Sequence, residues 1–221
     1  NALEMNQGDY EAKWFLNYLV KVGAISIDNP DEKKDESKFN SLMKTILTAT
    51  NNDERIRALR KMNEFVNTMT IKDIADIAKV INDTDAGIRR QLAVLLGYFK
   101  DDLSRSTVIR LIQDEEPFVA NAAISAAVAQ NNIDALPQIL DRMDESDLVG
   151  AAVSALRKFG SSRAAPKLAQ MLRTSDDTNC LFYLAALAAC GTPSEFGVIV
   201  ELMSRNSERV RENALLTLRK I

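Results

Sequence analysis

The sequence predicts an all-α fold, a right-handed α-α superhelix built from five to six helical hairpins. A pattern of apolar run, short acidic loop and second apolar run returns every 30 to 32 residues. The second apolar runs open at Ile56, Ile88, Val119, Val149, Cys180 and Val210. Within each run the apolar residues recur at intervals of three and four, which is helical periodicity. Repeats of this length with this periodicity are typical of hairpins that bury their apolar faces by stacking on their neighbours.

One hairpin shows the pattern in detail. Residues 164–172 predict its first helix, residues 176–177 mark an Asp-Asp loop, and residues 180–187 predict its second helix. A glycine follows at Gly191, and Gly160 stands in the same place one hairpin earlier. Because glycine adopts the left-handed conformation that closes many helices, we expect both residues to be helix C-caps.

Composition limits the classes of function. With 221 residues, 46% of them hydrophobic, the chain can bury a substantial core, which a solenoid spreads along its length. The formal net charge of −3 gives no overall attraction to nucleic acid. No apolar run approaches the roughly 20 residues that span a bilayer, so we expect no membrane insertion. The first and last residues predict a piece of a longer protein.

The residue types that carry most catalytic chemistry are absent or scattered. The chain contains no histidine, which excludes Ser-His-Asp and Cys-His nucleophile systems and the commonest transition-metal ligand. Acidic clusters at 114–116 and 144–147 could be metal ligands, but their place in the inter-helix loops favours N-capping of the second helices. We therefore expect no enzyme, no metal site and no cofactor.

The two cysteines fall on one expected helix. Cys180 and Cys190 are ten residues apart, a helical rise of about 15 Å, so they cannot form a disulfide with each other. Both lie among alanines and leucines, which favours small buried core residues over reactive thiols. Two free cysteines favour a reducing compartment, and we expect a cytoplasmic location.

The hairpins resemble the HEAT-repeat family, especially the short bacterial type called PBS-lyase HEAT-like repeats, an armadillo-type α-solenoid. In that pattern an aspartate lies in the loop. A branched apolar residue follows the loop, and an arginine comes directly after the branched residue. The matches are Asp83 with Ile88-Arg89, Asp114 with Val119, Asp144 with Val149, Asp176-Asp177 with Cys180, and Val210-Arg211 with Ala214. The resemblance implies repeats at about 39–69, 70–101, 102–131, 132–161, 162–192 and 193–221, together the domain 39–221.

The resemblance also implies a ladder of ion pairs along the row of repeats. In this family the arginine of one unit and the loop aspartate form rungs between neighbouring units. Ala120, Gly150 and Leu181 stand where the pattern has arginine. We therefore expect the middle of the ladder to lack these rungs.

Residues 1–25 differ from the repeats. Tyr10, Trp14, Phe15 and Tyr18 recur at helical spacing, and Gly23 marks an end. The predicted aromatic helix could cap the first repeat or could dock onto another domain or partner. Residues 26–38 are charged and rich in turn formers, which predicts a linker or long loop.

The second helices of such a stack line its concave wall, where we expect function to lie. Positions two, three and six after each opening residue should face outward, with small side chains such as Ala152 and Ala155 at the centre. Arginines flank this centre on one side and aromatic residues on the other, which would suit a helix or extended peptide with acidic and apolar ends. The candidate partner-binding residues are Arg89, Arg90, Asn121, Ser125, Phe182, Tyr183, Glu212 and Asn213.

A structural alternative is equally open for this wall. Phe182 and Tyr183 could turn partly into the core, and the arginines could be rungs of the ladder. At the level of function we expect a non-catalytic scaffold that binds a peptide or protein partner and no nucleic acid. The alternatives are a regulatory or sensory domain of a larger membrane or signalling protein, and a subunit of a lyase or a HEAT-like DNA glycosylase.

Overall fold

The computed structural model describes residues 35–221, and the structural statements that follow concern this part of the chain. Ser37–Ile221 form one compact unit. Every regular element between residues 35 and 221 is a helix, which confirms the predicted all-α class. The aromatic helix expected within residues 1–25 and most of the linker expected at 26–38 lie outside the described residues.

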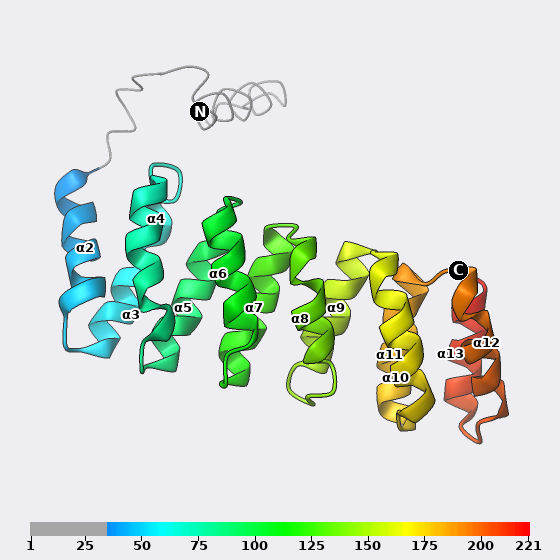
Figure 1. The fold of residues 1–221 in the computed structure, drawn as a ribbon. Coiled ribbons are helices and arrows are strands. Elements are labelled where there is room, and N and C mark those ends of the chain that lie inside the picture. The colour runs from blue at the N-terminus through cyan, green and yellow to red at the C-terminus, as the bar shows by residue number, and fades with distance from the viewer. Residues whose placement is uncertain (1–34) are drawn as a thin grey trace, which may run out of the picture. The chain divides into compact units, whose positions relative to one another are not determined.

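The described chain folds into six helical hairpins, each with a first and a second helix (Figure 1). The first helices are α2 (Glu36–Thr48), α4 (Ile71–Ala78), α6 (Asp102–Ile112), α8 (Leu136–Asp141), α10 (Ala165–Thr174) and α12 (Phe196–Glu201). The second helices are α3 (Asn52–Lys61), α5 (Ala86–Leu96), α7 (Pro117–Ala129), α9 (Val149–Phe159), α11 (Asp177–Cys190) and α13 (Glu208–Leu218). Short 3-10 turns extend several of these helices.

The hairpins stack side by side, so that first helices form one layer and second helices form the other (Figure 1). The core lies between the layers and runs through all six hairpins. Second helices contact one another more extensively than first helices do. Fully buried alanines such as Ala123, Ala152 and Ala186 allow this close approach. The second helices are therefore the more closely packed of the two layers.

The loop acids cap some second helices as expected. The Asp85 carboxylate accepts a hydrogen bond from the N–H of Ile88 at 3.1 Å, and the Asp176 carboxylate accepts one from the N–H of Asn179 at 2.8 Å. Helices α7 and α9 depart from this rule, because their N-caps, Glu116 and Leu148, make no side-chain cap hydrogen bond. The capping predicted for the acidic clusters at 114–116 and 144–147 is therefore wrong.

The two glycines expected as left-handed caps behave differently. Gly160 has a φ of 55° and closes α9 in the left-handed conformation, as predicted. Gly191 has a φ of −69° and a ψ of 161°, so the left-handed prediction is wrong there. The chain leaves α11 in an extended conformation that leads directly into the Thr192 capping box of the following 3-10 turn.

Candidate partner-binding surface

Two arginines join the first three hairpins at their loops. Arg55 donates a hydrogen bond to the Ile46 carbonyl in its own hairpin at 2.8 Å and forms an ion pair with Asp83 of the next. Arg89 repeats this arrangement, with a bond to the Asp83 carbonyl at 2.7 Å and two bonds to the Asp114 carboxylate at 2.7 and 2.8 Å. The ladder implied by the family resemblance is thus present at these two joints.

The charge of Asp114 is stabilised by this pairing. Burial disfavours the ionised carboxylate, but hydrogen bonds from Arg89 and from the Glu116 N–H, with the charges of Arg89 and Arg142, outweigh burial and lower the pKa of Asp114. The hydrogen bond to Asp114 raises the pKa of Arg89 in turn. Both groups are therefore charged at neutral pH.

The middle joints lack the arginine rungs, as the sequence predicts, but other side chains replace them. Arg142, in the fourth hairpin, donates to the carbonyls of Ile112 at 2.8 Å and Asp114 at 2.9 Å in the third. Tyr183, in the fifth hairpin, donates its hydroxyl proton to the Asp144 carboxylate of the fourth at 3.2 Å. These side chains reach back along the row, whereas Arg55 and Arg89 reach forward.

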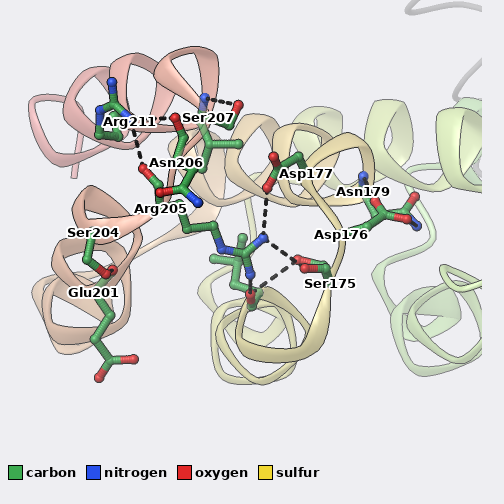
Figure 2. Close-up of polar contacts among 12 residues, drawn as sticks. Ser175, Asp176, Asp177, Asn179, Glu201, Ser204, Arg205, Asn206, Ser207 and Arg211 are labelled. Atoms are coloured by element: carbon green, nitrogen blue, oxygen red, sulfur yellow. Dashed lines mark hydrogen bonds and ion pairs between the residues drawn. The ribbon is translucent and has the colours of Figure 1, made fainter.

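The last joint is held by Arg205 (Figure 2). Its guanidinium donates to the Ser175 carbonyl at 2.9 Å, the Leu172 carbonyl at 3.1 Å and the Asp177 carboxylate at 3.2 Å. Arg205 therefore joins the sixth hairpin to the fifth in the same way that Arg142 joins the fourth to the third. Every joint between the described hairpins carries a polar link at the loops, made by different residues.

Two predicted site residues are buried. Arg89 is 7% exposed because its side chain lies in the ladder, and Tyr183 is 2% exposed because its ring packs into the core and its hydroxyl bonds to Asp144. Ala152 and Ala155, expected at the centre of the wall, are 0% and 1% exposed. Their expected outward orientation is wrong, because close stacking of the second helices leaves only a narrow exposed stripe.

The other predicted residues lie on that exposed stripe. The position two residues after the opening residue reaches solvent in α5, α7, α11 and α13. The exposed side chains are Arg90, Asn121, Ser125, Phe182 and Glu212, and Asn213 is half-buried.

A groove of about 540 Å³ separates α5 from α7 on this face, and we call it the α5–α7 groove. Tyr98 and Phe118 line it and are 56% and 47% exposed. Gly97 lies close to α7, since a Cβ there would lie 3.2 Å from Ala126. Arg90 is the one charged residue among those that line the groove. The full lining is Arg90, Val94, Gly97, Tyr98, Phe118, Asn121, Ala122, Ser125, Ala126 and Ala129.

A second groove, of about 470 Å³, lies between α11 and α13. Phe182 is 38% exposed here, and Asn213 lies on the facing helix. Arg209 and Asp177 add one charge of each sign to the lining. The structure thus brings Arg90, Asn121 and Ser125 together in one groove and Phe182 and Asn213 together in another.

Three groove residues, Tyr98, Phe118 and Arg209, were not predicted from the sequence. Phe118 and Arg209 each precede an opening residue by one position, where the helix has just begun and its first turn is still exposed. Tyr98 follows the last turn of α5. Tyr98 and Phe118 could have been found as large aromatic residues that lie at the ends of second helices and outside their apolar periodicity.

The two thiols are buried, as predicted. Burial raises the pKa of Cys180 and raises the pKa of Cys190 to about 11. Each cysteine is therefore protonated at neutral pH, which keeps it unreactive as a nucleophile.

Tyr183 gives the fold a measurable dependence on alkaline pH. Burial, followed by the charge of Asp144 and the hydrogen bond to it, raises the pKa of Tyr183 to about 12 from 10.0. The stabilisation from this raised pKa is complete below pH 10 and is lost as the pH rises toward 12, at about 1.4 kcal/mol per pH unit. We expect Tyr183→Phe to remove this slope in urea unfolding measured between pH 9 and 12.

Tyr98 provides the matched control for this experiment, because it is an exposed tyrosine on the same helical layer. Tyr98→Phe should keep the wild-type slope. At neutral pH, Tyr183→Phe should cost about 0.5–1.5 kcal/mol, the net value of one hydrogen bond. An unchanged slope in Tyr183→Phe would show that the hydroxyl is not buried against Asp144.

Comparison with known proteins gives a family match for part of the chain. Residues 74–149, from α4 to the start of α9, match the family model for HEAT repeats. A search of curated proteins finds no match.

Solved structures give matches over most of the chain. An engineered protein is 16% identical with a TM-score of 0.51, covering 82% of this chain and 95% of that one. A designed armadillo repeat protein in complex with the peptide (KR)4 is 14% identical with a TM-score of 0.51, covering 80% and 97%. The complex of CpcE and CpcF of phycocyanin lyase from Nostoc sp. PCC7120 is 15% identical with a TM-score of 0.55, covering 88% and 79%.

At these identities the structural likeness establishes the fold and nothing further. The six stacked hairpins and the structural neighbours show an all-α solenoid fold similar to that of armadillo repeat proteins, and residues 74–149 match the HEAT-repeat model.

Proposed function

We propose that this chain is a non-catalytic scaffold that holds a peptide or protein segment in the α5–α7 groove. One observation carries the proposal. Tyr98 and Phe118 are 56% and 47% exposed, and both line a hollow of about 540 Å³. Apolar surface gathered around a hollow is typical of a binding site, because a bound side chain removes that surface from water. Aromatic residues are also enriched among the residues that dominate binding energies.

The lining of the groove indicates the chemistry of the segment. Arg90 contributes a cation to the lining, and Asn121 and Ser125 offer hydrogen bonds. An apolar or aromatic side chain next to a carboxylate fits this set, with the carboxylate on Arg90 and the apolar group against Phe118. The designed armadillo neighbour holds a peptide, (KR)4, which supports the use of such a fold for peptide binding.

Several observations support a scaffold without catalytic activity. The chain has no histidine, and the described residues contain no group of three or more His, Cys, Asp or Glu that could hold a metal ion. The raised pKa values of both cysteines keep them protonated. The lyase and glycosylase alternatives need a reactive site that the α5–α7 groove does not provide, since Arg90 is its one ionisable group besides the Tyr98 phenol.

The cellular setting is a proposal as well. Among the helices of residues 35–221, none combines the length and the apolarity needed to cross a membrane. The two free cysteines support a reducing compartment, and we propose the cytoplasm. The regulatory or sensory alternative stays a prediction, since no observation of the described hairpins bears on it.

Selection of peptides on the protein tests the proposed function. A random peptide library displayed on phage is panned on the immobilised chain, and the selected peptides are measured in solution by fluorescence anisotropy. We expect peptides that pair an acidic residue with an apolar or aromatic one. Phe118→Ser should weaken them about 30-fold, the effect of losing one dominant contact of about 2 kcal/mol, and Arg90→Glu should weaken them at least about 10-fold.

Matched controls lie on the first-helix layer. Ile71, at the start of α4, is 57% exposed, and Arg110, on α6, is an exposed arginine. Ile71→Ser also replaces an exposed apolar side chain with serine, and Arg110→Glu makes the same charge reversal as Arg90→Glu. Both lie away from the groove and should leave the affinity unchanged. A library that returns no binder, or binders indifferent to Phe118→Ser and Arg90→Glu, would refute the groove as the binding site.

A further inference from the structure

The second helices beside the α5–α7 groove share one sign of charge. Helices α5, α7 and α9 contain no acidic residue, and their exposed charged side chains are Arg90 on α5 and Arg157 and Lys158 in the last turn of α9. Arg163, in the 3-10 turn Ser162–Ala164 that follows α9, is also exposed. The other described second helices each contain an acid, namely Asp53 in α3, Asp177 in α11 and Glu208 in α13. This part of the layer is therefore cationic in a chain whose formal net charge is −3.

The cations at the end of α9 have no counter-charge within residues 35–221. Arg157, Lys158 and Arg163 form no ion pair with a carboxylate of this part of the chain. The turn after α9, residues 160–164, contains no acid either. Acidic groups of a partner complement such a cluster, because opposite charges attract across an interface and like charges are disfavoured.

Burial places Arg157 and Lys158 on the same face as the groove. The buried residues of α9 and its N-cap repeat the spacing of those in α5, at a shift of 60 residues. The two sets are Ile88, Leu92, Ala93, Leu95 and Leu96 for α5, and Leu148, Ala152, Val153, Ala155 and Leu156 for α9. Helices with the same buried stripe expose the same side, so Lys158 corresponds to the groove residue Tyr98.

Helix α7 lies between α5 and α9 and brings the groove close to these cations (Figure 1). Its buried stripe matches that of α5 at a shift of 31 residues, so Ala129 corresponds to Tyr98 and to Lys158. Ala129 lines the groove, and Lys158 lies about one helix spacing beyond it, about 8–10 Å. The other exposed residues on this face of α9 are Gly150 and Ser154, which are small. No large side chain of α9 therefore separates the groove from Lys158.

The positions of Arg90 and Lys158 define the length of a segment that reaches both. Lys158 corresponds to Tyr98, which follows Arg90 by eight residues, a rise of about 12 Å along the helix axis. Helix α9 is two helix spacings from α5, about 16–20 Å. The two components give about 22 Å, which an extended peptide spans in about six to seven residues at roughly 3.3 Å per residue.

We propose that this cationic face binds an acidic peptide segment in two places, with one carboxylate on Arg90 and a second, about six residues away, on Arg157 and Lys158. The second contact rests on the proposed function, because it extends the segment whose apolar side chain lies in the α5–α7 groove. It adds the direction of the segment, from α5 across α7 to α9, and the spacing between its acids. Nucleic acid is a poorer occupant, because its phosphates recur at every nucleotide and would lie over α7, which has no cation.

The same pair of cations elsewhere in the chain provides a matched control. Arg60 and Lys61 end α3, on the far side of α5 from α9, and both are exposed. Cations in the last turn of a helix interact favourably with the helix dipole, so the two pairs share that role. Arg60→Gln with Lys61→Gln therefore removes the same charges and the same helix-end interaction as Arg157→Gln with Lys158→Gln. A difference in peptide binding between the two double variants then reports the location of the charges and not their number.

Parallel selections on the full chain test the second contact. A random library of peptides about twelve residues long, enough to span both contacts, is panned on the wild type and on each double variant. From the wild type and from Arg60→Gln/Lys61→Gln we expect peptides with two acidic positions about six residues apart and an apolar residue between them. From Arg157→Gln/Lys158→Gln we expect the first acid and the apolar residue alone.

The affinities of one selected peptide measure the size of the second contact. In fluorescence anisotropy at low salt, replacing the second acid of the peptide by its amide should weaken binding to the wild type about 5-fold to 10-fold, the scale of exposed ion pairs. The same replacement should have little effect on Arg157→Gln/Lys158→Gln, because the cations are already absent. The difference should shrink as the salt concentration is raised, since exposed charges are screened.

The outcomes separate failure of the second contact from failure of the proposed function. Peptides with one acid and an apolar residue, selected equally on the wild type and on Arg157→Gln/Lys158→Gln, would overturn the second contact and leave the groove in place. A second acid that depends on Arg60 and Lys61 would place the extension on α3 and would also overturn it.

The remaining outcomes concern the groove and the class of partner. Peptides without an apolar residue, or indifferent to Phe118→Ser, would refute the groove and the proposed function, and a library that returns no binder would refute both proposals. Displacement of the peptide by an equal concentration of a single-stranded DNA oligonucleotide would assign the face to nucleic acid and would overturn the peptide as its occupant.

Discussion

Replacing Arg89 with alanine should lower the free energy of unfolding by about 3–5 kcal/mol, the cost of removing one partner of a buried ion pair. Arg89 and Asp114 are only 9% and 7% exposed at their side chains, so both charges are largely removed from water. The variant leaves the Asp114 carboxylate buried and the Asp83 carbonyl without its donor. Urea unfolding at neutral pH measures the loss.

The double variant separates the interaction energy of the ion pair from the cost of leaving one buried charge without its partner. Asp114→Ala alone should also be costly, because it leaves the Arg89 charge buried, and Arg89→Ala with Asp114→Ala should cost less than the sum of the two. Lys79→Ala is the control, since Lys79 pairs with Asp76 at 68% side-chain exposure. Exposed pairs contribute about 0–1 kcal/mol. A loss in Arg89→Ala no larger than in Lys79→Ala would contradict the buried ladder.

The pH dependence of this difference has a definite sign. Because the folded pKa of Asp114 is lowered, the stabilisation is present above the ordinary value of 3.8 and is lost as the pH falls through the folded pKa. The gap between wild type and Arg89→Ala should therefore narrow in acid, below about pH 4. A gap that widens in acid would show that the carboxylate is not held ionised by Arg89.

Leu92→Ala should produce the other large effect, a loss of about 2–5 kcal/mol. Leu92 is 0% exposed on α5, and its removal leaves a cavity between the two helical layers. Leu215→Ala makes the same chemical change at a residue that is 42% exposed on α13, and it should cost far less. The difference between the two variants therefore measures the cost of burial and of the cavity, because the chemical change is the same in both.

The consequence of Leu92→Ala should be local. Since each hairpin packs mainly on its neighbours, stability in such a row is close to a sum of hairpin and interface contributions. Hydrogen exchange should therefore speed up in α4 to α7 well before it does in α10 to α13. Uniform acceleration across all six described hairpins would show a single cooperative core in place of a row of interfaces.

The sequence predicted the hairpins because the signals that define them are local. The 30 to 32 residue period and the apolar spacing depend only on neighbours along the chain. The same kind of signal could also have found Arg55, which follows the N-cap Asn51 by four residues as Arg89 follows Asp85. Arg55 precedes the opening residue Ile56, whereas Arg89 follows the opening residue Ile88, so positions counted from the opening residues do not align the two arginines.

The middle of the ladder could not be read in the same way. The pattern predicted missing rungs at Ala120, Gly150 and Leu181, and the rungs are missing. The links that replace them come from Arg142 and Tyr183, which stand at other positions in their hairpins and reach backward. The spacing of the repeat motif therefore does not identify Arg142 or Tyr183 as residues that link neighbouring hairpins.

The candidate site shows the same division. Phe182 and Tyr183 are adjacent in sequence, and a helix rotates about 100° between them, so one faces solvent and the other faces the core. Periodicity locates the apolar stripe of a helix but not the width of the stripe that its neighbours cover. That width depends on how closely the second helices pack, which in turn depends on alanines from several hairpins.

Periodicity, loop chemistry and composition were thus sufficient for the class of fold and the order of the hairpins, because each helix carries those signals within its own residues. The groove lined by Tyr98 and Phe118 and the burial of Tyr183 arise between helices. They depend on the rotation and spacing of neighbouring hairpins, which are set by packing along the whole row.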